Sequence, residues 1–236
     1  MTTDITTPSE TSLDERAADL ALETVHWITL LVDRSGSMED LRAATIDGLN
    51  TFIAQHGSDP TTRLRVVEFG TGPDERLELT LLYSNRVYPG VASRALRKLD
   101  YRPRGNTPLL AAVLRTINQL EPDVRPRDRA LIVIQTDGAD NASPDITVDM
   151  VRARIEEKQK LGNWTFAYLG AELDAWRVAE DLRIGALNSL SYATSASGVR
   201  AAYQLTTDAA TRWLGRARTR DLDGGFYPLQ LPSPQR

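Results

Sequence analysis

The chain has 236 residues, of which 41% are hydrophobic and 25% are charged, and its formal net charge is −4 at pH 7. This is the composition of an ordinary globular protein, and the small negative charge gives no indication of a nucleic-acid partner, so none is expected. Cysteine is absent, which excludes disulfide bonds and thiolate metal sites and suits a reducing compartment.

Apolar runs typical of buried strands alternate along the chain with segments of helical periodicity. The first run, HWITLLVD at residues 26–33, is almost continuously apolar, as expected of a strand covered on both faces. In chain order we expect a strand at 26–33, a helix at 39–56, strands at 63–70 and 76–82, a helix at 107–121, a strand at 129–137, a helix at 147–161, a strand at 164–169, a helix at 174–182, a strand at 186–191 and a helix at 198–218. The turn sequence GTGPDE between the second and third strands favours an antiparallel pair.

This alternation predicts an α/β fold of Rossmann-like type. We expect a mostly parallel central sheet of about six strands with one antiparallel edge strand and helices on both faces. Residues 1–20 are polar and rich in Thr and Ser, and residues 221–236 contain three prolines, so both segments are expected to be flexible tails. A single domain is therefore expected at 21–220.

The hydropathy of the chain predicts its location. The N-terminus lacks the basic start and the apolar stretch of a signal peptide. No window approaches the roughly 18 uncharged apolar residues that a membrane-spanning helix requires. We therefore expect a cytoplasmic protein without a membrane partner.

Five residues with oxygen-bearing side chains have the spacing of a divalent-cation site. They are Asp33, Ser35 and Ser37 in LLVDRSGS, Thr107 in RGNTPLL, and Asp137 in LIVIQTDG. Both aspartates fall at carboxyl ends of predicted strands, where ligands bind in open α/β sheets. In a loop that leaves a strand, alternate residues can point the same way, so the first three can face one ion. Carboxylates and hydroxyls are ligands of hard cations such as Mg²⁺, with Mn²⁺ and Ca²⁺ as alternatives.

The pattern Asp-x-Ser-x-Ser, a distant Thr and a distant Asp-Gly resembles the metal-ion-dependent adhesion site of the von Willebrand factor A domain. The resemblance covers roughly residues 24–192, and the wording DRSGSM, RGNTPL and TDGADNAS is most similar to intracellular bacterial and phage members. It implies that Ser35, Ser37 and Thr107 bind the ion directly. It also implies that Asp33 and Asp137 act mostly through water.

Structural interpretations of the same residues stay open at this point. Thr107 followed by Pro108 has the sequence of a helix N-cap, and Ser37 could cap a helix that starts near Met38. Asp137 with Gly138 could form only a turn after a strand. Asp140 and Asn141 are close enough in sequence to support the site, but a turn is the simpler interpretation.

The expected function is a non-enzymatic module that holds the cation and captures an Asp or Glu side chain of a partner protein. Arg34, Arg102 and Arg104 lie in or near the same loops and would form a rim that attracts the acidic partner. The alternatives are a metal-dependent phosphohydrolase and a cation-free structural or scaffolding domain. The chain has no Walker A loop and lacks the second aspartate of an Asp-x-Asp signature, which favours the binding module over the enzyme.

Overall fold

A computed structural model describes residues 23–86, 94–98, 100–171, 174–219 and 225–227. Its strands are β1 (His26–Asp33), β2 (Thr62–Thr71), β3 (Leu77–Ser84), β4 (Arg129–Thr136), β5 (Trp164–Ala171) and β6 (Ser189–Tyr192). Its α-helices are α2 (Arg42–His56), α3 (Leu109–Leu120), α4 (Val148–Lys160), α5 (Asp174–Asp181) and α6 (Ala196–Thr219). Short 3₁₀ helices are η1 (Gly36–Glu39), η2 (Glu121–Asp123) and η3 (Ala186–Asn188).

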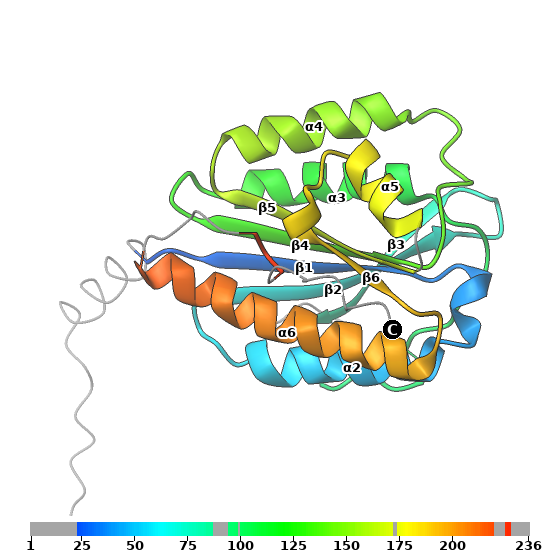
Figure 1. The fold of residues 1–236 in the computed structure, drawn as a ribbon, viewed down its shortest axis with the longest axis horizontal. Helices are drawn as coiled ribbons and strands as arrows, with labels where there is room; N and C mark the ends of the chain where they lie inside the picture. Colours follow the sequence, from blue (N-terminus) through cyan, green and yellow to red (C-terminus); the bar gives the residue numbers. More distant parts are fainter. Residues whose placement is uncertain (1–22, 87–93, 99, 172–173, 220–224, 228–236) are drawn as a thin grey trace, which may run out of the picture.

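The described strands form one six-stranded sheet in the order β3-β2-β1-β4-β5-β6 (Figure 1). All neighbouring pairs are parallel except β2 with β3, which is antiparallel. The α/β fold with one antiparallel edge strand is therefore confirmed. Strand β1 is central and pairs with β2 over its whole length, from His26 opposite Thr62 to Asp33 opposite Phe69.

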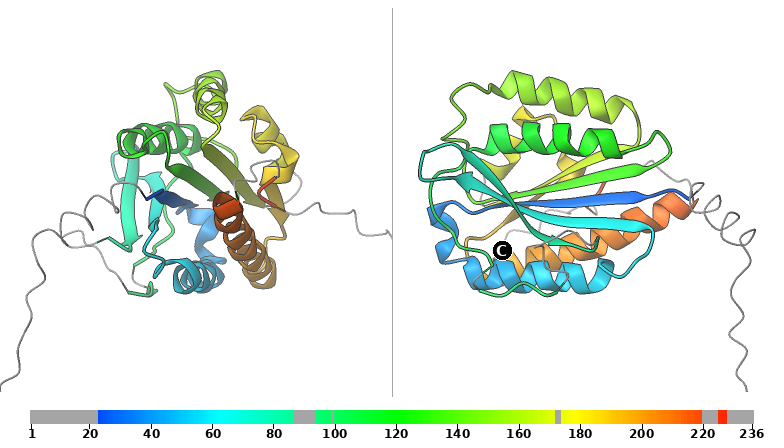
Figure 2. Two further views of the ribbon diagram at one scale, coloured as in Figure 1. Left: turned by 90° about the vertical axis from the view of Figure 1, so that its left-hand side faces the viewer. Right: turned by 180° about the vertical axis from the view of Figure 1, so that it is seen from behind.

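Helices cover both faces of the sheet. Helices α2 and α6 lie together on one face, and α3, α4 and α5 lie on the other, as Figures 1 and 2 show from several directions. Successive side chains of β1 pack alternately into the two hydrophobic cores. Leu30 belongs to the cluster under α2 and α6, and Leu31 belongs to the cluster under α3. Because both faces are buried, the strand has the continuous apolar sequence from which it was predicted.

Helix starts depart from the prediction at the two loops that carry predicted ligands. The segment after Asp33 forms the 3₁₀ helix η1, and α2 begins only at Arg42. Helix α3 begins at Leu109 with Pro108 as its N-cap residue, so Thr107 lies outside the helix. Ser35 and Thr107 thus lie in loops, and Ser37 lies in η1.

The C-terminal segment is partly packed, which corrects the expected flexible tail at three of its residues. Phe226 and Tyr227 are buried, and the Tyr227 N–H donates to the Leu187 carbonyl over 2.8 Å. Two aromatic side chains bury enough apolar surface to order a short segment. The expected N-terminal tail and the remainder of 221–236 lie outside the described residues. Among the described helices none is long and apolar enough to cross a membrane.

Candidate metal centre

The carboxyl ends of β1 and β4 bring the two predicted aspartates to one edge of the sheet. Asp33 is the last residue of β1, and Asp137 follows Thr136, the last residue of β4. The two strands are parallel neighbours with Val32 opposite Gln135. Residues 104 positions apart in sequence therefore meet because parallel strands end at the same edge.

The Asp33 carboxylate is fully buried and fixed by two donors. Its Oδ1 accepts the Ser35 N–H over 2.7 Å, and its Oδ2 accepts the Thr136 hydroxyl over 2.6 Å. Burial raises the pKa of Asp33 to about 6, against the opposite effect of these hydrogen bonds. A buried carboxylate without a cationic partner among its hydrogen-bonding groups is costly to ionise, and a bound cation would supply the missing charge.

A chain of side-chain oxygens joins the first loop to the end of β4. The hydroxyls of Ser35 and Ser37 share a hydrogen bond of 3.1 Å, and the Ser37 hydroxyl donates to Asp137 Oδ1 over 2.9 Å. Ser37 is exposed and Asp137 is half-buried, so this series of hydrogen-bonded side chains reaches the surface. Burial also raises the pKa of Asp137, whereas the Ser37 hydrogen bond lowers it. This set of hydroxyl and carboxylate oxygens fits the ligand preference of Mg²⁺ and Mn²⁺.

Thr107 lies in a loop that is bonded to both of the other loops. Its N–H donates to Asn141 Oδ1 over 2.8 Å, and the Asn141 N–H donates to the Thr107 carbonyl over 3.0 Å. On the other side, the Gly36 N–H donates to the Gly105 carbonyl over 3.0 Å. The Thr107 side chain is buried, with 4% of the residue exposed. The three loops with the five predicted residues are thus one hydrogen-bonded unit.

The start of α3 is capped from outside the helix, by the loop that follows Asp137. The Leu110 N–H donates to Asp140 Oδ1 over 2.9 Å, and the Ala111 N–H donates to the Ser143 hydroxyl over 3.1 Å. The interpretation of Thr107 as the N-cap is therefore wrong, because Asp140 and Ser143 satisfy these helix N–H groups. Asp140 and Asn141 are thus more than the turn that is their simpler interpretation in the sequence, and no pattern there indicates Ser143.

The capping interpretation of Ser37 is also not supported. The residue that precedes η1 is Ser35, and its side chain makes no capping hydrogen bond. The Ser37 hydroxyl is bonded across the site to Asp137 instead. Among the described residues no group of three or more His, Cys, Asp or Glu side chains could hold a metal, and the candidate centre combines two carboxylates with three hydroxyls.

The predicted rim needs one correction. Arg34 is fully buried, because it alternates with Asp33 and Ser35 and points to the opposite side of the loop, toward Glu68 and Glu78. Burial raises the pKa of Glu68 to about 7, although Arg34 acts in the opposite direction. Arg102 and Arg104 are exposed, as the rim requires.

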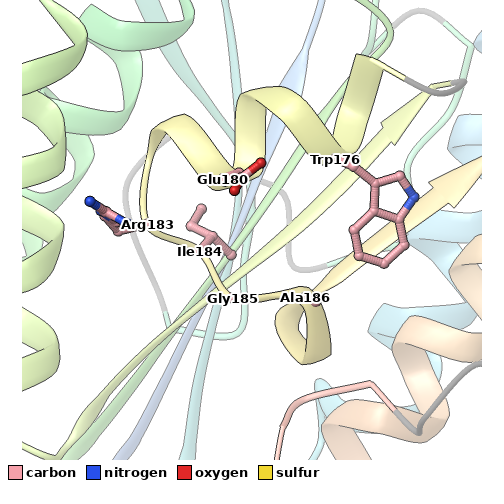
Figure 3. Close-up of a pocket in the computed structure, with 6 residues that line it drawn as sticks. All are labelled: Trp176, Glu180, Arg183, Ile184, Gly185 and Ala186. Carbon is pink, nitrogen blue, oxygen red and sulfur yellow. The ribbon is translucent and has the colours of Figure 1, made fainter.

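A separate pocket of about 430 Å³ lies between α5 and η3 (Figure 3). Its lining residues are Trp176, Glu180, Arg183, Ile184, Gly185 and Ala186. None of them belongs to the predicted set. The oxygen cluster at the strand ends is thus distinct from this hollow.

Comparisons with known proteins agree with the fold. Residues 28–139 match the family model of the von Willebrand factor type A domain. The open conformation of the pilus adhesin SpaC from Lactobacillus rhamnosus GG is similar, with a TM-score of 0.59, 15% identity and coverage of 79% of this chain and 30% of that chain. The vWF domain of the type V pili tip protein Mfa5 from Porphyromonas gingivalis has a TM-score of 0.56, 10% identity and coverage of 81% and 97% respectively.

A third similar structure is the manganese-loaded TRAP protein of Plasmodium vivax, with a TM-score of 0.51, 20% identity and coverage of 76% of this chain and 72% of that chain. No curated protein matches the chain. At these identities the structural likeness shows the fold alone, and this chain spans less than a third of SpaC. The family match makes residues 28–139 similar to a von Willebrand factor type A domain, and the shared sheet shows the same fold.

Proposed function

We propose that this chain is a non-enzymatic binding module that holds one divalent cation and captures a carboxylate of a partner protein. The observation that carries the proposal is the hydrogen-bonded series from Ser35 through Ser37 to Asp137, which joins two strand ends at the protein surface. Mg²⁺ is the proposed cation, with Mn²⁺ or Ca²⁺ as alternatives.

The donor set explains why the bound cation would take a ligand from outside. In the proposed centre Ser35, Ser37 and Thr107 bind the ion directly, and Asp33 and Asp137 act mostly through water. Three neutral hydroxyls leave the ion with residual positive charge, which favours an Asp or Glu side chain as the remaining ligand. Ser37 is exposed, so a partner side chain can approach from solvent.

Helix N-termini give this anion little support. Helix α3 points its N-terminus toward the same edge, but Asp140 and Ser143 already occupy two of its N–H groups. The helix expected at 39–56 begins only at Arg42, after the four-residue η1. The cation itself, with Arg102 and Arg104 at the rim, therefore carries most of the attraction for an acidic partner.

A binding module is proposed over a phosphohydrolase because no His or Lys base is hydrogen-bonded to the Ser35 and Ser37 hydroxyls. These hydroxyls are bonded to each other and to a carboxylate instead. A cation-free scaffold is the remaining alternative. A cytoplasmic location and a relation to intracellular bacterial or phage proteins stay predictions of the sequence.

Cation-induced stabilisation without turnover is the expected result that separates these functions. We expect Mg²⁺ or Mn²⁺ at a hundred times the Kd to raise the free energy of unfolding by about 2.7 kcal/mol, since only the folded state binds. Differential scanning calorimetry at constant ionic strength measures this change. Hydrolysis of a generic phosphate ester under the same conditions would favour the enzyme, and identical melting in Mg²⁺ and EDTA would favour the scaffold.

Thr107 offers a sharper test of direct coordination. We expect Thr107→Ala to weaken cation binding about tenfold, whereas Thr107→Ser, which keeps the hydroxyl, retains most of the affinity. The alanine variant should lose about 1 kcal/mol of stability, which is typical of a point substitution. Titration calorimetry, under conditions in which both variants are folded, compares their cation affinities. An equal loss of affinity in both variants would remove Thr107 from the ligand set.

A further inference from the structure

Glu78 on the antiparallel strand β3 is bonded to arginines from two of the three loops of the candidate centre. Arg34 Nη2 donates to Glu78 Oε2, and Arg104 Nη2 lies 3.8 Å from the same oxygen. Arg34 stands between Asp33 and Ser35 in the first loop, and Arg104 precedes Thr107 by three residues in the second. One carboxylate outside the ligand set therefore ties together the two loops that carry four of the five predicted ligands.

The backbone of the two loops is joined at the same place. The Arg104 N–H donates to the Arg34 carbonyl over 2.6 Å, and the Arg34 N–H continues the ladder to β2 by donating to Phe69 O over 2.8 Å. Arg34 Nη2 also donates to the Thr71 carbonyl over 3.3 Å. The Arg34 side chain thus crosses from the first loop, over the end of β2, to β3.

Two glycines leave the room that this arrangement needs. A Cβ at Gly70 would come within 2.8 Å of Arg34 Cγ, and a Cβ at Gly72 would come within 2.4 Å of Glu78 Oε1. Any larger residue at either position would displace Arg34 or Glu78. The absence of a side chain at Gly70 and at Gly72 therefore leaves space for Arg34 and Glu78.

Stability alone is a weak reason for this buried charge. Arg34 is fully buried, yet its Nε and Nη1 have no hydrogen-bond partner, and its contact with Glu68 is an ion pair at 3.7 Å. An incompletely paired buried cation costs desolvation energy that an apolar side chain would not, so such pairs are often neutral or unfavourable for folding. A role in fixing loop geometry accounts for the Arg34–Glu78 pair better.

We propose that Glu78 is a positioning residue for the cation centre, which holds the Asp33–Ser37 loop and the Thr107 loop in register through Arg34 and Arg104. The inference rests on the proposed function. It adds a dependence of cation affinity on a residue of the edge hairpin that supplies no ligand. Groups that orient metal ligands typically change affinity about 10- to 100-fold when they are removed.

The structure offers a matched control for the test. Glu121 also has a side chain that is 41% exposed, like Glu78, and it also contacts two basic side chains, Arg154 and Lys158. It lies in η2, after the C-terminal end of α3, whereas the centre is at the N-terminal end. Replacing either glutamate by glutamine removes one charge from a similar two-cation cluster.

The experiment compares parent, Glu78→Gln and Glu121→Gln by Mn²⁺ titration and by hydrogen exchange in EDTA. We expect Mn²⁺ affinity to fall about tenfold in Glu78→Gln and to stay unchanged in Glu121→Gln. In the cation-free protein, the amides of Gly36 and Arg104 should exchange faster only in Glu78→Gln, because their hydrogen bonds join the two loops.

The two ideas fail in different ways. A parent protein that binds no Mn²⁺ would overturn both the proposed function and the inference. A parent that binds Mn²⁺ as tightly as Glu78→Gln, with equal exchange at Gly36 and Arg104, would overturn the inference and leave the proposed function intact.

Discussion

Asp33→Asn is expected to abolish cation binding while leaving the metal-free protein at least as stable as the parent at pH 7.5. The asparagine removes the charge that the cation needs, and we expect affinity to fall about a hundredfold or more. Its carboxamide can keep both hydrogen bonds: Oδ1 accepts the Ser35 N–H, and Nδ2 can donate to the Thr136 hydroxyl. That hydroxyl is 3.1 Å from the Gly138 carbonyl, which it can use as its new acceptor.

The stability change follows from the raised pKa of Asp33. A carboxyl whose pKa rises from 3.8 to about 6 on folding binds its proton more tightly in the folded state, so its contribution to stability is present below pH 3.8 and is lost as pH rises through 6. At about 1.4 kcal/mol for each pKa unit, the loss is on the order of 3 kcal/mol. Asp33→Asn lacks this loss, so its free energy of unfolding should depend less on pH than that of the parent.

Chemical denaturation of both proteins in EDTA at pH 4 and 7.5, with Mg²⁺ titration at pH 7.5, measures both effects. Thr136→Val is a useful companion, because it removes one of the two donors to Asp33 and leaves the charge in place. Wild-type Mg²⁺ affinity in Asp33→Asn would refute the site as assigned. A large loss of stability in EDTA would instead assign the carboxylate a structural role.

Periodicity was sufficient to predict five of the strands, but at the sixth, expected at 186–191, residues 186–188 form η3 and β6 is Ser189–Tyr192. It predicted the helix ends less well. The strand at 26–33 was predicted with its observed bounds, because a strand buried on both faces has an uninterrupted apolar sequence. The start of α3 was predicted two residues early. Its first N–H groups are satisfied by Asp140 and Ser143, about 30 residues further along the chain, and local sequence contains no sign of such a contact.

The sequence was sufficient to predict that the loops meet, but it was not sufficient to predict that Arg34 is buried. Asp33 ends β1 and Asp137 follows β4, and the parallel arrangement of these strands alone puts the two residues at one edge. Arg34 is expected at the rim, although its alternation with Asp33 and Ser35 directs it to the other side of the loop. Its burial depends on Glu78 and on the two glycines that make room on the neighbouring hairpin. Partners on another strand are tertiary information that a single loop sequence lacks.

Loss of partner binding in EDTA is the second large effect that we expect. A partner protein captured by the chain in Mg²⁺ should be released by EDTA and should not bind Asp33→Asn, because its carboxylate would be the ligand that completes the coordination. One Asp or Glu of that partner should be essential, so its replacement by Asn or Gln should abolish binding as fully as EDTA does. Surface plasmon resonance with the purified partner measures all three losses.

The kinetics of the same interaction test the rim. Arg102 is exposed near the centre, and Arg102→Ala leaves the contact between Arg104 and Glu78 in place. Rim charges act during approach and are screened over roughly 8–10 Å at physiological salt. Arg102→Ala should therefore slow association more than it speeds dissociation, and the decrease in association rate should become smaller as salt rises.

Arg183→Ala is the control, since Arg183 is also exposed but follows the C-terminal end of α5 and pairs with Glu156. An equal decrease in association rate for both variants would show that the arginines act only through the net charge of the protein. Full-strength binding in EDTA would refute capture through a cation.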